Sequence, residues 1–346
     1  MSKVLLIELS DSHSEVFRPV RNYLSEAGFE TDCFVTEKYP IENNGLVKRV
    51  AYGSRIHQLA ELNRYIHAHR YENLFFNTAE GLSVRDFCYL NHFRNLNICG
   101  VLHQAKKLKG SYTQKVISSK IKNYFVLAEY IKDYACGLNN RIELEYFYPL
   151  SPYSGERHTE KLIITVPGEI ALWRRDYVWL IEFIKNNIGN IRNKFYFIFL
   201  GSADNPDGKK VTGYIKENNL NEVIKFYDSY ISENEFDKVI GSSALIFPLL
   251  NPGVGEYDSY RRTKISGAFN LSFNYRIPML MNNDFRDAKD FQNISFFYDK
   301  QNFTDVLNSI NEESIKLLAD NFEKDVRFSY DYQSNKFRIF VNKIFK

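Results

Sequence analysis

Short apolar runs of strand length recur along the sequence and alternate with amphipathic stretches of helix length. The first run predicts a strand at Val4–Leu9, and the next stretch predicts a helix at Glu15–Glu26 that ends at Gly28. Repeated pairs of this kind are typical of βαβ units, in which helices bury a parallel sheet. The pattern therefore predicts an α/β protein. Further strands in the first half are expected at Thr31–Val35, Leu74–Asn77, Leu96–Leu102 and Tyr124–Ala128.

The alternation is interrupted between Tyr148 and Glu160, where prolines, a glycine and polar residues replace the periodic pattern. A chain of 346 residues is long enough for two cores. We therefore predict two Rossmann-like domains, residues 1–150 and 160–325, and a helical tail over 326–346. The carboxyl ends of both sheets are expected to face each other across a cleft. Strands of the second domain are expected at Leu162–Val166, Tyr196–Leu200, Val223–Tyr227, Ala244–Leu249 and Pro278–Met281.

The charge of the chain and its N-terminal sequence limit the partners that we expect. The chain has 45 basic and 42 acidic residues and a net charge of +3, so no broad positive field predicts a nucleic-acid partner. The N-terminal apolar run is too short for a signal peptide or a membrane span, which favours a cytoplasmic protein and leaves peripheral contact with the inner membrane face open. Four cysteines lie far apart and form no CxxC pair, so we expect no metal site and expect buried, reduced thiols: Cys33, Cys88, Cys99 and Cys136. We also expect no cofactor.

The segment VPGEIALWRRDY follows the first strand of the second domain and contains Gly168, Arg174 and Arg175. A glycine lets the backbone approach a ligand closely, and two guanidinium groups suit the oxygens of a diphosphate. The alternative is that both arginines form a solvated basic face that pairs with Asp176.

A second basic segment, GEYDSYRRTKISGAF, contains Lys264, Ser266 and Gly267 at an expected helix N-terminus, where backbone amides favour an anion. An ordinary helix cap with a charged first turn is the alternative. The segment lacks the GxxxxGK spacing of ATPases, and the first strand of the chain is not followed by GxGxxG. Neither an ATPase nor a dinucleotide dehydrogenase is therefore favoured.

In the first domain, His13 and Glu15 come directly after the first strand, where either side chain could act as a general base toward a hydroxyl. The alternative is that Ser12 or Ser14 caps the following helix and Glu15 lies in its first turn. Other polar residues follow later strands of this domain, and for the histidine among them a hydrogen-bonded structural role is the alternative. These residues are Thr78, Glu80 and His103.

The second half resembles the donor-binding domain of GT-B glycosyltransferases, a group that includes glycogen-synthase-like, capsule and lipopolysaccharide transferases. The resemblance rests on VPGEI and RRDY, FIFLGSA, VIKFYDSYISENEF, SSALIFPLL and TKISGAFNLSFNYRIPML. It implies a GT-B fold whose C-terminal helices pack back toward the N-terminal domain. It also implies a diphosphate site at Gly168, Arg174, Arg175, Lys264, Ser266 and Gly267, and a base and ribose site at Tyr230, Ile231 and Glu256.

The resemblance implies a metal-independent glycosyltransferase that moves a sugar from a nucleotide-diphosphate sugar to a glycan or lipid-linked acceptor in surface polysaccharide synthesis. Many members carry two glutamates eight positions apart, whereas Glu256 is followed at that distance by Lys264. Two alternatives therefore stay open: a sugar-nucleotide epimerase on the same fold, and a non-catalytic subunit that binds a partner or a glycan.

Overall fold

The computed structural model describes residues 2–41, 46–51, 54–151 and 161–345. Residues 152–160, most of the expected linker, lie outside the described part. The chain divides into two compact units. The N-terminal domain comprises Met1–Ser151, Thr263–Ile265 and Tyr330–Lys346, and the C-terminal domain comprises Pro152–Arg262 and Ser266–Ser329.

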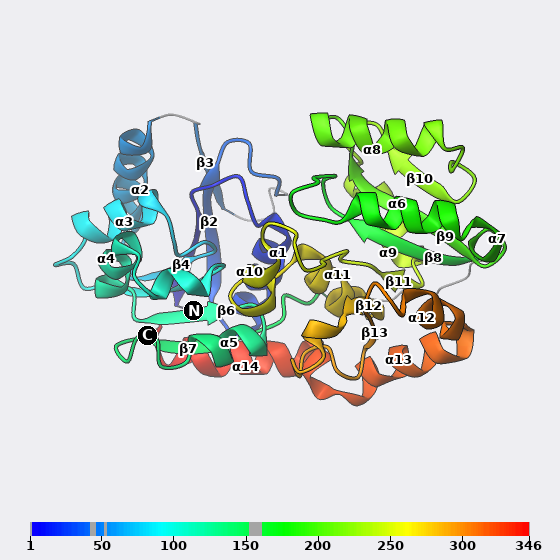
Figure 1. Cartoon of the computed structure of the whole chain (residues 1–346). Helices are drawn as coiled ribbons and strands as arrows, with labels where there is room; N and C mark the ends of the chain where they lie inside the picture. The colour runs from blue at the N-terminus through cyan, green and yellow to red at the C-terminus, as the bar shows by residue number, and fades with distance from the viewer. Residues whose placement is uncertain (1, 42–45, 52–53, 152–160, 346) are drawn as a thin grey trace. The chain divides into compact units, whose positions relative to one another are not determined.

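The N-terminal domain is a seven-stranded parallel sheet with the strand order β3-β2-β1-β4-β5-β6-β7 (Figure 1). Its strands are β1 Lys3–Glu8, β2 Glu30–Thr36, β3 Val47–Val50, β4 Asn73–Phe76, β5 Asn97–Val101, β6 Asn123–Val126 and β7 Glu143–Tyr146. Its helices are α1 Ser14–Glu26, α2 Arg55–His69, α3 Leu82–Leu90, η1 Ala105–Leu108, α4 Tyr112–Lys120, α5 Glu129–Ala135 and α14 Tyr330–Asn342.

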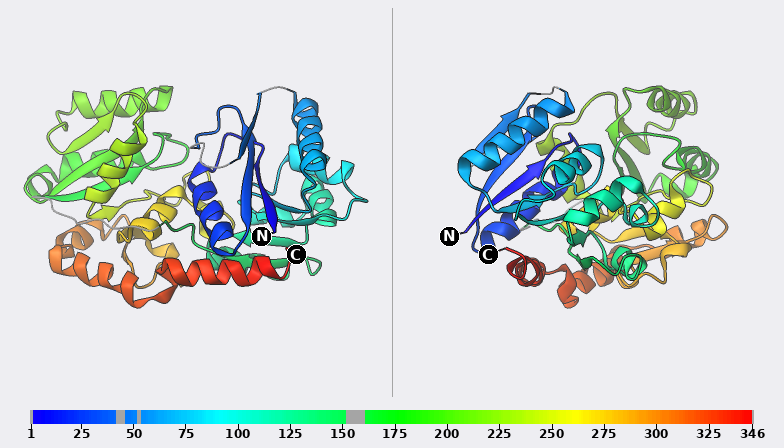
Figure 2. Two further views of the ribbon diagram at one scale, coloured as in Figure 1. Left: turned by 180° about the vertical axis from the view of Figure 1, so that it is seen from behind. Right: turned by 90° about the vertical axis from the view of Figure 1, so that its left-hand side faces the viewer.

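The last helix of the chain completes the core of the N-terminal domain. Figure 2 shows α14 lying beside α1. The ring of Phe337 in α14 stacks on Phe125 of β6 with centroids 4.5 Å apart, and Phe340 packs against the same ring. The backbone N–H of Tyr148 donates to Oε1 of Gln333 in α14 at 3.1 Å. The prediction that C-terminal residues pack back on the N-terminal domain is therefore confirmed for α14.

The C-terminal domain is a six-stranded parallel sheet with the order β10-β9-β8-β11-β12-β13. Its strands are β8 Leu162–Pro167, β9 Phe195–Ser202, β10 Ile224–Tyr227, β11 Leu245–Ile246, β12 Met279–Asn282 and β13 Ser295–Tyr298. Its helices are α6 Tyr177–Asn186, α7 Ile188–Ile191, α8 Pro206–Glu217, α9 Glu233–Ser242, α10 Tyr257–Arg262, α11 Gly267–Tyr275, η2 Asn283–Phe285, α12 Phe303–Ser309, α13 Glu312–Lys324 and η3 Val326–Phe328.

The predicted α/β class with two Rossmann-like domains is confirmed, but the sequence pattern missed three strands. These strands, β3, β7 and β13, all form edges of their sheets. An edge strand has one neighbour and tolerates polar side chains, so VKRV in β3 and ELEY in β7 carry no continuous apolar run. The prediction of buried thiols is confirmed for three cysteines and wrong for Cys136, which is exposed.

Candidate functional site

In each sheet the strand order reverses at one point, and the loops at that point mark where open α/β sheets bind ligands. In the N-terminal domain the reversal lies between β1 and β4, so the loops after Glu8 and Phe76 border it. In the C-terminal domain it lies between β8 and β11, so the loops after Pro167 and Ile246 border it.

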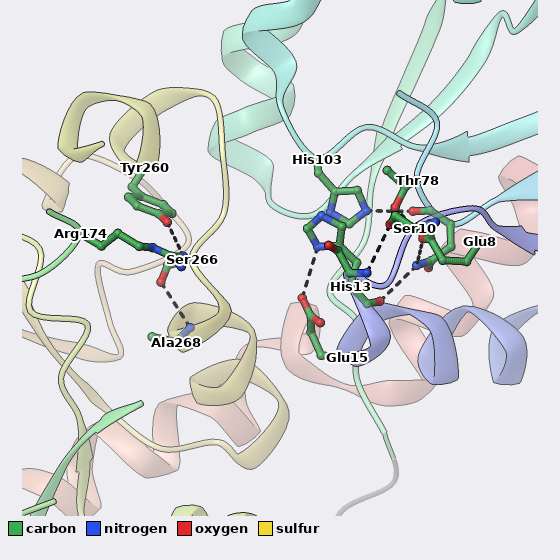
Figure 3. A network of polar contacts seen from close by, with 12 residues as sticks. Glu8, Ser10, His13, Glu15, Thr78, His103, Arg174, Tyr260, Ser266 and Ala268 are labelled. Atoms are coloured by element: carbon green, nitrogen blue, oxygen red, sulfur yellow. Dashed lines mark hydrogen bonds and ion pairs between the residues drawn. The ribbon is translucent and has the colours of Figure 1, made fainter. Parts of the chain in front are cut away.

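A buried carboxylate organises the N-terminal loops (Figure 3). Glu8 is the last residue of β1, and its Oε1 accepts hydrogen bonds from the backbone N–H and the hydroxyl of Ser10, each at 2.8 Å. Its Oε2 accepts from Nδ2 of Asn77 at 2.9 Å and from the hydroxyl of Thr78 at 2.6 Å. Burial raises the pKa of the Glu8 carboxyl above its ordinary value, although these donors act in the opposite direction. Glu8 therefore ties the loop after β1 to the loop after β4.

Asn77 connects this carboxylate to two histidines. Its Nδ2 also donates to the carbonyl of His13 at 3.1 Å, and its own carbonyl lies 2.8 Å from Nε2 of His103. Because a carbonyl only accepts, Nε2 of His103 must carry the proton, which leaves Nδ1 without one in the neutral ring. Burial, followed by the nearby charges of His13 and Lys107, lowers the pKa of His103 well below its ordinary value, so the ring is neutral near pH 7.

The ring of His13 stacks on His103 with centroids 3.6 Å apart and an interplanar angle of 13°. His13 has a left-handed backbone conformation, with φ of 64°, which is uncommon for a residue other than glycine. It is the residue that precedes α1, and its side chain makes no capping bond. The predicted alternative, a cap by Ser12 or Ser14, is therefore wrong. The half-buried His13 Nδ1 lies 3.6 Å from the carboxylate of Glu15 in the first turn of α1.

The structure thus brings four of the predicted residues of this domain to one sheet edge: His13, Glu15, Thr78 and His103. Glu80 is also buried in the loop after β4, and its Oε2 lies 3.2 Å from Nζ of Lys107. Glu80 therefore pairs with Lys107 rather than with the Glu8 and histidine network.

In the C-terminal domain, Gly168 follows β8 with φ of 99°, a conformation that favours glycine. A side chain at this position would also meet the guanidinium of Arg175, since an added Cβ would lie 3.0 Å from Nη2. Arg175 is only 6% exposed, and its Nη1 donates to the carbonyl of Glu169 at 3.3 Å. The glycine therefore makes room for a buried cation behind the loop.

Arg174 lies beside it, half-buried, and its Nη2 donates to the hydroxyl of Tyr260 at 2.9 Å (Figure 3). The Nε atoms of Arg174 and Arg175 are both buried without a hydrogen-bond acceptor. Across the described ranges, neither guanidinium forms an ion pair with a carboxylate. Asp176, the partner in the alternative interpretation, instead pairs with Lys300 and accepts from Nδ2 of Asn251. The interpretation as a solvated basic face is therefore wrong.

The second basic segment is divided between the two domains. Ser266 caps α11, its hydroxyl accepting from the backbone N–H of Ala268 at 3.3 Å, and Gly267 is the exposed first residue of that helix. Lys264 belongs to the N-terminal domain, where its backbone forms an isolated antiparallel bridge with Gln104. The hydroxyl of Tyr130 donates to the carbonyl of Lys264 at 2.9 Å.

The residues expected to bind the nucleotide base and the ribose follow strands β10 and β11. Tyr230 is 85% exposed, and Ile231 beside it is half-buried, in the loop between β10 and α9. Ser232 then caps α9 by accepting from the backbone N–H of Glu235. Glu256 precedes α10, and its carbonyl accepts from the backbone N–H groups of Ser259 and Tyr260.

Sequence reasoning did not identify Glu8, Asn77 or Tyr260 as site residues. The available signal for Glu8 was a carboxylate inside the apolar run VLLIEL, since a buried acid needs donors. Asn77 ends a predicted strand, and its amide side chain was a weaker signal of the same kind. No local signal pointed to Tyr260, because its contact with Arg174 spans 86 residues.

Within the described residues, no group of three or more His, Cys, Asp or Glu side chains could hold a metal ion. No helix in the described part of the chain is long and apolar enough to cross a membrane.

The chain matches no protein-family model and no curated protein sequence. Several solved structures share its whole architecture at low identity. Anabaena HepE, solved in complex with UDP and glucose, has a TM-score of 0.67 and 9% identity over 99% of each chain. A glycosyltransferase from Rickettsia africae ESF-5 has a TM-score of 0.64 and 11% identity over 99% of this chain and 97% of its own. A putative UDP-N-acetylglucosamine 2-epimerase from Listeria monocytogenes has a TM-score of 0.61 and 11% identity over 96% of this chain and 94% of its own.

Proposed function

The chain has the GT-B fold, and on that premise we propose that it is a glycosyltransferase. It moves a sugar from a nucleotide-diphosphate sugar to a hydroxyl of a glycan or a lipid-linked acceptor, in the synthesis of a surface polysaccharide. The fold neighbours support the class of reaction, since structures described as glycosyltransferases match nearly the whole chain.

The observation that carries the proposal is the pair of arginines after β8. A buried cation without a carboxylate is costly, and an anionic ligand removes that cost. Both guanidinium groups lie at the point of strand reversal, where this architecture binds ligands, and each has an Nε without an acceptor. A diphosphate supplies such acceptors in a geometry that suits a guanidinium.

The same charges serve the chemistry. As the bond between the anomeric carbon and the diphosphate breaks, negative charge grows on the leaving oxygen, and fixed cations stabilise it more in the transition state than in the ground state. In this proposal Arg174, Arg175, Lys264 and the first amides of α11 supply that stabilisation, and no metal ion takes part.

The acceptor is activated by the N-terminal domain. The acceptor oxygen forms a bond to the anomeric carbon while its proton passes to Nε2 of His13. Glu15, 3.6 Å from Nδ1, stabilises the imidazolium that results. His103, with its proton held at Nε2 by Asn77, supports the His13 ring as a neutral stacking partner.

A sugar-nucleotide epimerase is the second candidate, because the Listeria structure, described as a putative UDP-N-acetylglucosamine 2-epimerase, shares the fold. An epimerase would convert the nucleotide sugar without an acceptor. A non-catalytic subunit would leave every nucleotide sugar intact.

Incubation of the purified protein with a panel of nucleotide sugars, with and without glycan or lipid-linked acceptors, and mass spectrometry of the products tests the proposal. We expect the free nucleoside diphosphate and a glycosylated acceptor. Arg175→Ala and Lys264→Ala proteins should turn over the donor at least about tenfold more slowly. Arg192→Ala is the matched control, because Arg192 pairs with Glu222 at the exposed surface. Undiminished turnover in both site variants would contradict the diphosphate site.

A further inference from the structure

One stretch of the N-terminal domain has a large excess of basic over acidic residues. Residues 81–128 contain eight lysines and arginines and a single acid, Asp86. This stretch therefore carries a formal charge of +7, and the remainder of a chain with a net charge of +3 is acidic. The eight cations are Arg85, Arg94, Lys106, Lys107, Lys109, Lys115, Lys120 and Lys122.

The same stretch exposes large apolar side chains. Phe93, directly after α3, is 99% exposed, Tyr89 in α3 is 77% exposed and Tyr112 at the start of α4 is 75% exposed. Leu82 and Leu90 of α3 are also exposed. Single exposed apolar residues are ordinary, but five exposed large apolar side chains within 31 residues are a concentration that calls for a partner.

These side chains lie on two helices that pack side by side, α3 and α4 (Figure 1). Leu82 and Tyr89 are seven residues apart and therefore share one face of α3. At the other end of α4, Nζ of Lys120 donates to the carbonyl of His92 at 3.2 Å and to that of Arg94. The turn that carries Phe93 is therefore fixed to α4. We call the exposed side of these two helices, with Leu82, Tyr89, Leu90, Phe93 and Tyr112, the α3–α4 face.

The charges around the apolar residues are mostly exposed. Arg85 is neutralised by Asp86, which also pairs with Arg55, and Lys107 pairs with Glu80. Five cations of the stretch have exposed side chains. They are Arg94, Lys106, Lys109, Lys115 and Lys122.

We propose that the α3–α4 face docks the protein on the surface of an anionic lipid bilayer. Aromatic and leucine side chains enter the boundary between headgroups and acyl chains, and lysines around them contact anionic headgroups. Charge complementarity favours lipid over a second copy of the chain, since two such faces would repel each other. Aliphatic Leu82 and Leu90 in the patch suit acyl chains better than stacked nucleic-acid bases.

The buried side of α4 packs on the loop that carries Thr78 and Glu80, because Nε2 of the buried Gln114 donates to the carbonyl of Ala79 at 3.4 Å. Docking through the exposed side of α4 would therefore leave this helix between the loop and the membrane. The proposal stands independently of the glycosyltransferase activity, because lipid binding is measured without a donor or an acceptor.

Flotation of the full-length protein with vesicles tests the proposal. One set contains phosphatidylcholine alone and the other contains phosphatidylcholine with phosphatidylglycerol. We expect binding to the anionic vesicles, weaker binding at high salt, and little binding to phosphatidylcholine alone. Each surface cation is worth about fivefold in binding, so a Lys109→Glu, Lys115→Glu double variant should bind at least about tenfold more weakly. A Tyr89→Ser, Phe93→Ser double variant should also lose binding.

The matched control is a Lys316→Glu, Leu317→Ser double variant on α13, which exchanges an exposed lysine and an exposed leucine elsewhere. It should bind vesicles like the unaltered protein, and circular dichroism should show all variants folded. Absent binding to anionic vesicles, equal binding to both vesicle sets, or equal loss in the control would overturn the proposal. Dimerisation or RNA binding that depends on Phe93, without vesicle binding, would overturn it as well.

Discussion

The two loop sets differ in what their charged groups already hold. In the N-terminal domain, both oxygens of Glu8 accept hydrogen bonds, from Ser10 on one side and from Asn77 and Thr78 on the other. In the C-terminal domain, Arg174 and Arg175 each retain a buried Nε without an acceptor. The charge of Glu8 is therefore already compensated by donors of the protein, whereas the two arginines lack an opposite charge. Removing the charge of Glu8 should therefore lower the stability of the protein without ligand, whereas removing the charge of Arg175 should not.

The largest expected effect is the loss of stability in Glu8→Ala. The substitution leaves the buried amide of Asn77 and the half-buried donors of Thr78 and Ser10 without their acceptor, and each unsatisfied buried group costs about 1–3 kcal/mol. We expect the free energy of unfolding of the N-terminal domain to fall by about 3 kcal/mol after the loops relax toward water. Urea unfolding followed by fluorescence measures this.

Glu30→Ala is the control for this variant, since Glu30 forms an exposed ion pair with Lys3 in the same sheet and should cost less than about 1 kcal/mol. Equal losses in the two variants would mean that the Glu8 network contributes no more than a surface pair, and the contrast between the two loop sets would be lost.

The opposite case is Arg175→Met, which keeps most of the side-chain volume and removes the charge. Without a ligand, the thermal midpoint should stay constant or rise, because a buried cation without a carboxylate costs free energy. Hydrogen bonds to a charged group contribute about 1.5–3 kcal/mol, so the dissociation constant for a nucleoside diphosphate should rise about 10- to 100-fold. Thermal shifts with a panel of nucleoside diphosphates measure both quantities.

Arg192→Met is the control, since Arg192 is exposed and pairs with Glu222. It should leave the dissociation constant for the nucleoside diphosphate unchanged. A marked fall in the midpoint of Arg175→Met without ligand would show that Arg175 holds the fold together, and its assignment to a ligand would then fail.

The contrast also explains how far sequence reasoning reaches. The buried strands follow from local apolar runs, and the two-domain division follows from the interruption of that pattern after Tyr148. The environment of Arg175 does not follow from local sequence, because it depends on the left-handed turn at Gly168, and two adjacent arginines resemble a solvated surface in any local window. Lys264 and Ser266 are close in sequence, but the backbone of Lys264 pairs with Gln104 of the N-terminal domain. Such assignments need contacts between distant residues, which residue spacing does not encode.

The smallest expected effect separates the two histidines. The pKa of His103 is lowered well below its ordinary value of 6.5, so below about pH 6.5 the unfolded chain binds a proton that the folded chain does not. Stability contributed by the neutral ring is therefore fully present above pH 6.5 and is lost as the pH falls toward the lowered pKa. The slope should reach about 1.4 kcal/mol per pH unit. His103→Gln keeps a donor for the Asn77 carbonyl and does not titrate, so this part of the slope should vanish.

Chemical unfolding between pH 5 and pH 8 measures the slope, with His57→Gln on the exposed side of α2 as the matched control. If His103→Gln and the control keep the same slope, the histidine is not held neutral by its surroundings. If only His103→Gln flattens the curve, the neutral ring belongs to the completed N-terminal network. That result would leave His13, the half-buried partner in the stack, as the histidine of this pair for the proposed role of general base.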